Sequence, residues 1–186
     1  VPLGEWVLQE ACRQAAVWGS NTRGLTISVN VSALQFEHPS FLPAVQKALE
    51  LSGLDPHRLI LELSESSVLS SAGAASQLFT RLKALGVRLS MDDFGTGYSS
   101  LSTLRAFPFD KIKLDRSFMS ELDGGPQSSA IIRAVLALGE SLAIPVLAEG
   151  VETLEQLSFL RDQGCTEAQG YLLGRPKPVA DDLIQL

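Results

Sequence analysis

The sequence predicts an α/β protein, a (β/α)8 TIM-like barrel that is incomplete because its first strands are missing. Short apolar runs alternate with longer helical patterns, about six strands can be counted, and a helical pattern without a preceding strand opens the chain. A complete barrel takes about 250 residues, whereas this chain has 186. No GxGxxG follows a strand, which disfavours the alternative of a doubly wound sheet that binds a dinucleotide.

Six runs have the composition of strands, and several are apolar at nearly every position, as strands buried on both faces are. The predicted strands are Thr26–Val31, Leu59–Leu63, Val87–Met91, Lys111–Leu114, Val146–Ala148 and Ala168–Leu172.

Helical patterns separate these runs, and repeated βα units favour a parallel sheet with right-handed crossovers. The predicted helices are Pro2–Trp18, Phe41–Leu51, Gln77–Leu85, Ser128–Leu142 and a last helix that begins with a Thr153–Gln156 capping box and ends near Gly164. Because the sequence contains no repeat, linker or low-complexity tract, we expect residues 1–186 to form one domain.

Composition narrows the class of partner. The formal net charge of -6 argues against a DNA or RNA polymer, which is normally bound by a basic surface. The separated cysteines Cys12 and Cys165 predict two free, buried thiols in a reducing compartment. No apolar run approaches the roughly 20 residues of a membrane helix. The acidic balance of the composition favours a cytoplasmic location.

Polar side chains lie at or near the end of every predicted strand. They are Asn30, Glu62, Glu65, Asp92, Asp93, Lys113, Asp115, Glu149 and Gln169. Each one alone could be a turn, cap or surface residue, and Lys113 could simply pair with Asp115. In a parallel barrel, however, the carboxyl ends of the strands meet at one rim. Several carboxylates there would repel one another, and a bound cation is the simplest relief.

The ligand types indicate which metal to expect. Carboxylate and amide oxygens suit Mg²⁺, Mn²⁺ or Ca²⁺, whereas zinc usually takes His or Cys. The histidines, His38 and His57, lie away from the strand ends. The adjacent Asp92 and Asp93 could bridge or flank a pair of metals, an arrangement that recurs in phosphodiester cleavage.

The ordered motifs NVS, ELSES, DDFGTGYSS, KLD, EGVE and QGY, with PLGEWVL before them and GRP after them, resemble the EAL-domain family of cyclic di-GMP-specific phosphodiesterases. The resemblance covers essentially the whole chain, and DDFGTGYSS is its most specific part. It implies hydrolysis of cyclic di-GMP to linear 5'-pGpG with two Mg²⁺ or Mn²⁺ ions.

The resemblance also implies a set of metal ligands. Asn30, Glu62 and Asp92 would bind one ion. Asp92, Asp93 and Glu149 would bind the second, with Asp92 bridging the two. Glu149 is also one of the expected catalytic residues.

The remaining roles come from the same resemblance. Lys113 would orient or activate the attacking water, and Gln169 and Asp115 would belong to the substrate and water network. Glu65 would steady the loop Phe94–Ser100, which places the two aspartates and borders the family's dimer surface. Lys113 and Glu65 therefore complete the expected catalytic set.

The sequence departs from the family pattern at its start. The Glu-Ala-Leu motif, whose glutamate is a family metal ligand, is absent, as is a nearby arginine that contacts substrate phosphate. We expect both to lie upstream of Val1, and we expect weak or no turnover by these residues alone. Ser64 replaces a usual threonine and keeps its hydroxyl.

Two alternatives stay open. One is a degenerate EAL domain that acts as a non-catalytic cyclic di-GMP receptor or an interaction module. The other is an unrelated metal-dependent barrel enzyme such as an aldolase, which would make the motif order accidental. The resemblance to the EAL family further implies a homodimer. We also expect the chain to be fused to sensory or other signalling domains in a longer parent protein. A membrane segment of that parent protein could tether it.

Overall fold

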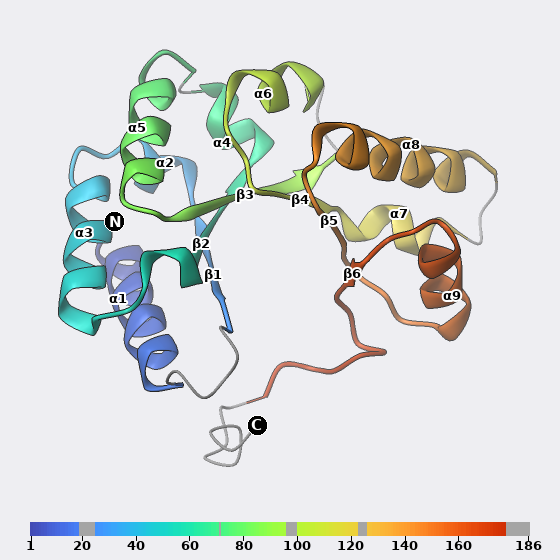
Figure 1. Ribbon diagram of the computed structural model, residues 1–186, viewed down its shortest axis with the longest axis horizontal. Helices are drawn as coiled ribbons and strands as arrows, with labels where there is room; N and C mark the ends of the chain where they lie inside the picture. The colour runs from blue at the N-terminus through green and yellow to red at the C-terminus, as the bar shows by residue number, and fades with distance from the viewer. Residues whose placement is uncertain (19–24, 71, 96–99, 123–125, 178–186) are drawn as a thin grey trace. The chain divides into compact units, whose positions relative to one another are not determined.

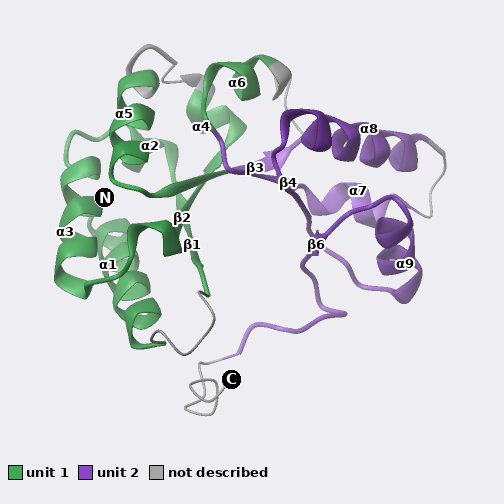
Figure 2. Ribbon diagram, in the orientation of Figure 1, with its two compact units in different colours: residues 1–90, 101–108, 178–186 green, residues 91–100, 109–177 purple. Residues whose placement is uncertain are grey.

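The structure is a computed structural model that describes residues 1–18, 25–70, 72–95, 100–122 and 126–177 (Figure 1). The chain divides into two compact units (Figure 2). Unit 1 comprises Val1–Ser90, Leu101–Pro108 and Pro178–Leu186, and unit 2 comprises Met91–Ser100 and Phe109–Lys177.

Strands and helices alternate along the chain. The strands are β1 (Ile27–Val31), β2 (Leu59–Ser64), β3 (Arg88–Phe94), β4 (Lys111–Leu114), β5 (Val146–Ala148) and β6 (Glu167–Ala168). The helices are α1 (Pro2–Val17), α2 (Ala33–Phe36), α3 (Phe41–Ser52), the 3-10 helix η1 (Pro56–Arg58), α4 (Glu65–Ser70), α5 (Ala72–Ala84), α6 (Ser100–Ala106), α7 (Arg116–Ser120), α8 (Pro126–Leu142) and α9 (Leu154–Asp162). The strands follow sequence order in a six-stranded sheet.

In unit 1, β1 and β2 form a parallel pair in which Val29 lies beside Leu61 and Asn30 lies beside Glu62. Leu59 to Leu63 are all buried, as expected for a strand covered on both faces. Because successive side chains of a strand alternate between faces, Asn30 and Glu62 share the face opposite Val29 and Leu61. This pairing fixes which polar groups of unit 1 lie together.

The helices of unit 1 cover this pair with an apolar core. Helix α1 starts with Pro2 and packs against α3 and β1, burying residues spaced four and three apart, Leu8, Cys12 and Ala15. Helix α3 ends at Gly53, whose φ of 66° suits the left-handed cap that glycine adopts without strain. Aromatic rings link the helices, with Phe79 5.7 Å from Phe36 and 4.7 Å from Phe107 between ring centroids.

In unit 2, β4, β5 and β6 are short and parallel. Helix α8 packs against β4, β5 and α7. Gly139 allows a close approach, since a Cβ there would overlap Val146 of β5. Thr153 caps α9, accepting from the backbone N–H of Gln156, and the Gln156 side chain accepts in return from the Thr153 N–H. The predicted capping box is therefore confirmed.

The structure confirms the alternation of strands and helices, but several elements differ from the prediction. The helix predicted as Gln77–Leu85 begins earlier, at Ala72, and the short helices α2, α4, α6 and α7 were not predicted. The third strand continues through Asp92 and Asp93 to Phe94. The last strand, predicted as Ala168–Leu172, was wrong in its bounds, because it covers only Glu167–Ala168 and the chain then turns. The turn is closed by backbone bonds to the Gly170 carbonyl from the N–H groups of Leu173 and Gly174, each 3.1 Å.

Both cysteines are free, as predicted, although only Cys12 is fully buried and Cys165 is half-buried. Over the described ranges, the helices include none that combines the length and the apolar character needed to cross a membrane.

Candidate functional site

The centre of the candidate site in unit 2 is the buried ammonium group of Lys113. Its Nζ lies 3.0 Å from Asp92 Oδ1 and 2.9 Å from Glu149 Oε1. The Lys113 side chain is 6% exposed, against 15% for Asp92 and 19% for Glu149. A buried ion pair of this kind is costly to desolvate, so a lysine held by two carboxylates indicates a function beyond stability.

The strands explain why these three groups meet. Lys113 pairs in register with Leu147, and Glu149 comes two residues after Leu147, so its side chain returns to the same face. The Glu149 N–H donates to Leu114 O at 3.2 Å, which fixes the backbone just past the end of β5. The buried Ile112 and Leu114 fill the opposite face of β4. The prediction that strand ends converge is confirmed here for Asp92, Lys113 and Glu149.

Asp93 adds a second acidic group beside Asp92. Its φ of 55° is left-handed, a region that aspartate tolerates better than most residues, and its N–H donates to Asp92 Oδ1 at 3.1 Å. Partial burial raises the pKa of Asp93, and the like charges of Asp92 and then Asp115 raise it further, against the opposing effect of Lys113. Although largely exposed, Asp93 therefore belongs to the same electrostatic cluster.

Asp115 has a structural task. It caps α7, accepting at Oδ1 from Ser117 N at 2.9 Å and from Ser117 Oγ at 2.5 Å. Burial alone would raise the pKa of Asp115, but these hydrogen bonds outweigh it and lower the pKa. Its participation in a water network stays a prediction.

In unit 1 the structure brings together Asn30 and Glu62, as register partners on one face of β1 and β2. Asn30 is exposed and Glu62 is 7% exposed. An amide oxygen beside a buried carboxylate is a donor pair of the kind that hard cations prefer.

Glu65 is buried at the start of α4, with 3% of its surface exposed. The preceding Ser64 accepts at Oγ from Ser67 N at 3.4 Å and lies 2.6 Å from Ser67 Oγ. Both contacts are made by the Ser64 hydroxyl, a group that threonine also has. Residues 96–99 of the loop that Glu65 was predicted to steady lie outside the described residues.

Gln169 follows β6 and has an exposed side chain. Its N–H donates to Ala148 O at 2.8 Å, and its carbonyl accepts from Val151 N at 3.0 Å. The backbone of Gln169 is therefore fixed next to the segment that carries Glu149, whereas the role of its amide group stays a prediction.

Sequence reasoning missed the glycine that follows Glu149. Gly150 has a φ of 74°, and a Cβ at this position would lie 2.6 Å from Arg116 Cβ. The sequence signal for this position was a glycine directly after a candidate acidic residue. Glycine adopts a positive φ without strain, and it has no Cβ to collide with Arg116.

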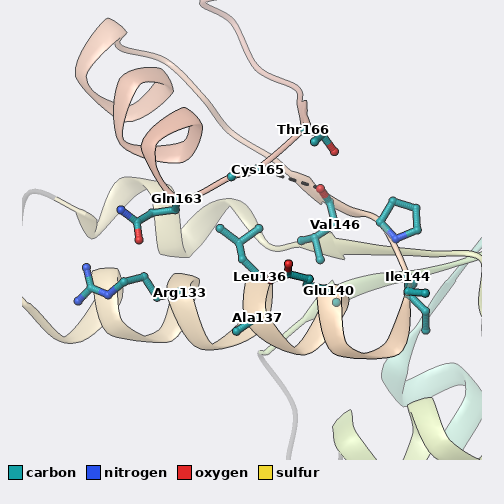
Figure 3. A pocket seen from close by; sticks show the side chains of 13 residues that line it. Arg133, Leu136, Ala137, Glu140, Ile144, Val146, Gln163, Cys165 and Thr166 are labelled. Carbon is teal, nitrogen blue, oxygen red and sulfur yellow. Dashed lines mark hydrogen bonds between the residues drawn. The ribbon is translucent and has the colours of Figure 1, made fainter.

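A cavity of about 540 Å³ in unit 2 lies elsewhere (Figure 3). Its lining includes Arg133 and Glu140 of α8, Pro145 just before β5, and Cys165 just before β6. Because Pro145 and Cys165 come just before their strands, the cavity is at the amino ends of β5 and β6. Figure 3 also shows the weak bond from Cys165 Sγ to Val146 O, 3.7 Å long. In parallel α/β folds the functional groups gather at the carboxyl ends, so the cavity is not part of the candidate site.

The donor chemistry fits a hard divalent cation. Asp92 and Glu149 already converge on one positive charge, that of Lys113, and neighbouring acids raise the pKa of Asp93, so additional cationic charge would be favourable there. Among the residues that the structure describes, no three His, Cys, Asp or Glu side chains are grouped closely enough to hold a metal ion. Asn30 and Glu62 in unit 1, and Asp92, Asp93 and Glu149 in unit 2, are the candidate ligands.

Curated relatives are much longer than this chain. A signalling protein without an assigned role from Caulobacter vibrioides is 53% identical over 95% of the chain and 22% of its own length. The bifunctional diguanylate cyclase/cyclic di-GMP phosphodiesterase MucR of Pseudomonas aeruginosa is 46% identical over 96% of the chain and 26% of its length. The chain thus spans about a quarter or less of these proteins.

Solved structures share its fold. The phosphodiesterase PaMucR in complex with cyclic di-GMP matches with a TM-score of 0.91 and 46% identity, over 96% of this chain and 72% of that one. Klebsiella pneumoniae BlrP1 in complex with manganese and cyclic di-GMP matches with a TM-score of 0.80 and 30% identity, over 92% of this chain and 45% of that one. These matches confirm the predicted EAL-type α/β fold. The sequence profile of the EAL domain covers residues 1–176, and the chain therefore belongs to the EAL domain family.

Proposed function

We propose that the domain to which this chain belongs binds cyclic di-GMP and hydrolyses it to linear 5'-pGpG with two divalent ions, Mg²⁺ or Mn²⁺, and that the chain by itself turns the substrate over weakly or not at all. The observation that carries this proposal is the buried Lys113 ammonium between Asp92 and Glu149. Lys113 belongs to β4, and Glu149 follows the carboxyl end of the neighbouring strand β5, the end of a parallel sheet where functional groups gather. Relatives named as cyclic di-GMP phosphodiesterases support the substrate.

The proposed ligands are Asn30, Glu62 and Asp92 for one ion, and Asp92, Asp93 and Glu149 for the other. When bound, such ions neutralise phosphate charge and lower the pKa of a bound water. The BlrP1 complex with manganese supports a divalent requirement, and the oxygen-only donor set suits Mg²⁺ or Mn²⁺.

Lys113 would hold the attacking water or take up its proton. Asp92 and Glu149 fix the Nζ atom from two sides, and positioning of this kind is a large part of the catalytic effect in phosphate chemistry. In its protonated form the Nζ is a donor that can orient a water oxygen. In its neutral form it could act as a general base. Glu65, Gln169 and Asp115 are proposed to support the surrounding loops and waters.

The partners follow from the same proposal. We infer that the chain acts in the cytoplasm as a homodimer. Because it spans only 22–26% of the relatives described above, we also infer that it acts next to other signalling domains. Light scattering on the purified chain tests the dimer.

The decisive experiment is product analysis with cyclic di-GMP in water enriched in ¹⁸O, with Mg²⁺, Mn²⁺ or EDTA. From the full domain, extended upstream of Val1, we expect pGpG with one ¹⁸O in its 5'-phosphate, formed only when a divalent ion is present, and from the chain alone we expect little or none of this product. Turnover in EDTA would contradict the metal requirement. Binding of cyclic di-GMP by the full domain in calorimetry without any pGpG would favour the receptor alternative, and the absence of both binding and turnover by the full domain would overturn the substrate assignment.

A further inference from the structure

Two glycines of unit 2 follow residues of the candidate site within two positions in the sequence, and each packs closely against α7. Gly95 follows Asp93 by two positions, and a Cβ on it would lie 2.8 Å from the Phe118 ring. Gly150 follows Glu149, and its Cβ would lie 2.6 Å from Arg116 Cβ and 3.1 Å from Arg116 Cα. Close packing leaves no room for an added carbon at such distances. The close approach at Gly150 bears most directly on a functional side chain.

The backbone around Gly150 is fixed on both sides. Before it, Glu149 N donates to Leu114 O at 3.2 Å. After it, Val151 N donates to Gln169 O at 3.0 Å, and Leu172 N donates to Val151 O at 3.1 Å. These hydrogen bonds fix the backbone from Glu149 to Val151, and at Gly150 this backbone lies close to Arg116.

Helix α7 is anchored as well. Asp115 caps its first turn, and the buried Gln156 donates from Nε2 to Met119 O at 2.9 Å. Because hydrogen bonds hold both α7 and the Glu149–Val151 segment, a side chain added at Gly150 would strain both, and any displacement of the segment would carry the Glu149 side chain with it. The Glu149 carboxylate would then leave its position 2.9 Å from Lys113 Nζ.

We propose that Gly150 is a positioning residue: its lack of a side chain allows the close passage over Arg116 that holds Glu149 against Lys113. The effect on turnover rests on the proposed function, whereas the effect on Lys113 itself does not. A misplacement of about 1 Å in a catalytic group can cost roughly 100-fold in rate, so this close passage is expected to matter for chemistry more than for substrate binding.

The test compares G150A with G164A. Both glycines have left-handed φ angles, 74° and 78°, but nothing lies within 4 Å of a Cβ at Gly164. The pair therefore separates the steric effect from backbone strain. We expect G150A to lower kcat by roughly 30- to 100-fold with KM changed less than about threefold, and G164A to stay within about twofold. Equal kcat values for the two variants would overturn the proposal.

Removing the opposing carbon should restore the position. In an R116G background the Cβ that lies 2.6 Å away is gone, and only the backbone carbon of residue 116, at 3.1 Å, remains close. We expect the penalty of Gly150→Ala, measured as G150A/R116G against R116G, to fall to about fivefold or less. An undiminished penalty would show that the Arg116 side chain is not the cause.

A measurement without turnover distinguishes failure of this inference from failure of the proposed function. Lys113 is 5% exposed, so its acetylation by an amine-reactive ester, followed by mass spectrometry of metal-free protein, should be slow. We expect G150A to raise its labelling rate at least about fivefold and G164A to leave it unchanged. If no variant hydrolyses cyclic di-GMP but this labelling difference holds, the proposed function fails and the positioning role stands. If wild type hydrolyses and the labelling rates agree, the positioning role fails.

Discussion

Strands β2 and β4 each bury a charged side chain, and the two units accommodate that charge in different ways. In unit 1, Glu62 lies in a strand whose apolar residues are all buried, and its register partner is the amide of Asn30. In unit 2, Lys113 lies between the buried Ile112 and Leu114, and its ammonium contacts the carboxylates of Asp92 and Glu149.

In unit 2 the buried lysine contacts two carboxylates, whereas in unit 1 the register partner of the buried carboxylate is an asparagine. The Lys113 cluster carries its own counter-ions, so it should be sensitive to loss of any one member. A carboxylate beside an amide is a donor set suited to a cation from outside the chain.

Replacing Lys113 by methionine removes the cation and leaves Asp92 and Glu149 facing each other. We expect turnover of cyclic di-GMP to fall at least about 100-fold and the free energy of unfolding to fall by about 3–5 kcal/mol. Product analysis and urea unfolding measure the two effects. The matched control is K111M, which breaks the more exposed pair with Glu167 and should cost no more than about 1 kcal/mol. Equal destabilisation by both variants would remove the contrast between them.

In unit 1 the largest stability effect should come from the aromatic core. Phe79 is 1% exposed and contacts Phe36 and Phe107, so F79A should lower the free energy of unfolding by about 3–5 kcal/mol. At a temperature where the variant is still folded, labelling of Lys113 in unit 2 should match wild type. The control L51A, at a side chain 71% exposed, should change stability by less than about 0.5 kcal/mol. Faster Lys113 labelling in folded F79A would show that the cluster depends on the core of unit 1.

Glu62 provides the sharpest test of an external cation. E62Q keeps the shape of the side chain and removes its charge, so we expect Mn²⁺ affinity by calorimetry to weaken at least about tenfold. Stability without metal should change by no more than about 1.5 kcal/mol. The exposed Glu50, also in unit 1, gives the control E50Q, which should bind Mn²⁺ as wild type does. Unchanged Mn²⁺ binding by E62Q would remove Glu62 from the proposed ligand set.

The smallest expected effect concerns the reactivity of the two cysteines, one of which lies in each unit. Burial raises the pKa of Cys12 from its usual 9.0 to about 11, and burial also raises the pKa of Cys165, which is only half-buried. A thiol-reactive dye at pH 8 should therefore modify Cys165 first and Cys12 only after urea is added. C165S should abolish the first phase. Modification of Cys12 in the folded state would contradict the burial.

The raised pKa of Cys12 makes the free energy of unfolding depend on pH. The folded state of Cys12 holds its proton more tightly than the unfolded state, so its stabilising contribution is present below pH 9 and is lost as pH rises toward about 11. Urea unfolding at pH 8 and pH 10.5 should show a smaller loss for C12A than for wild type. An equal loss would mean that Cys12 does not contribute to the difference.

Periodicity alone located the long helices and the apolar strands, because these elements repeat a pattern over many residues. The short helices α4 and α7 escaped prediction, since each depends on side-chain hydrogen bonds, from Ser64 to the Ser67 N–H and from Asp115 to Ser117. The last strand was predicted too long because the apolar letters after Gly170 continue through a turn that backbone bonds impose.

For the candidate site, the sequence determined which residue types stand at the strand ends and, through the ordered motifs, the family. The tertiary structure determined which of these residues contact one another. Lys113 pairs with Asp92 and Glu149, whereas Asp115, two residues away, turns to cap a helix. Sequence could not distinguish these outcomes, because the pairing follows from the register of β4 and β5; the proposed role of Gly150 likewise depends on a segment distant in sequence, at Arg116. Both join segments far apart in the chain, and local pattern carries no information about such distances.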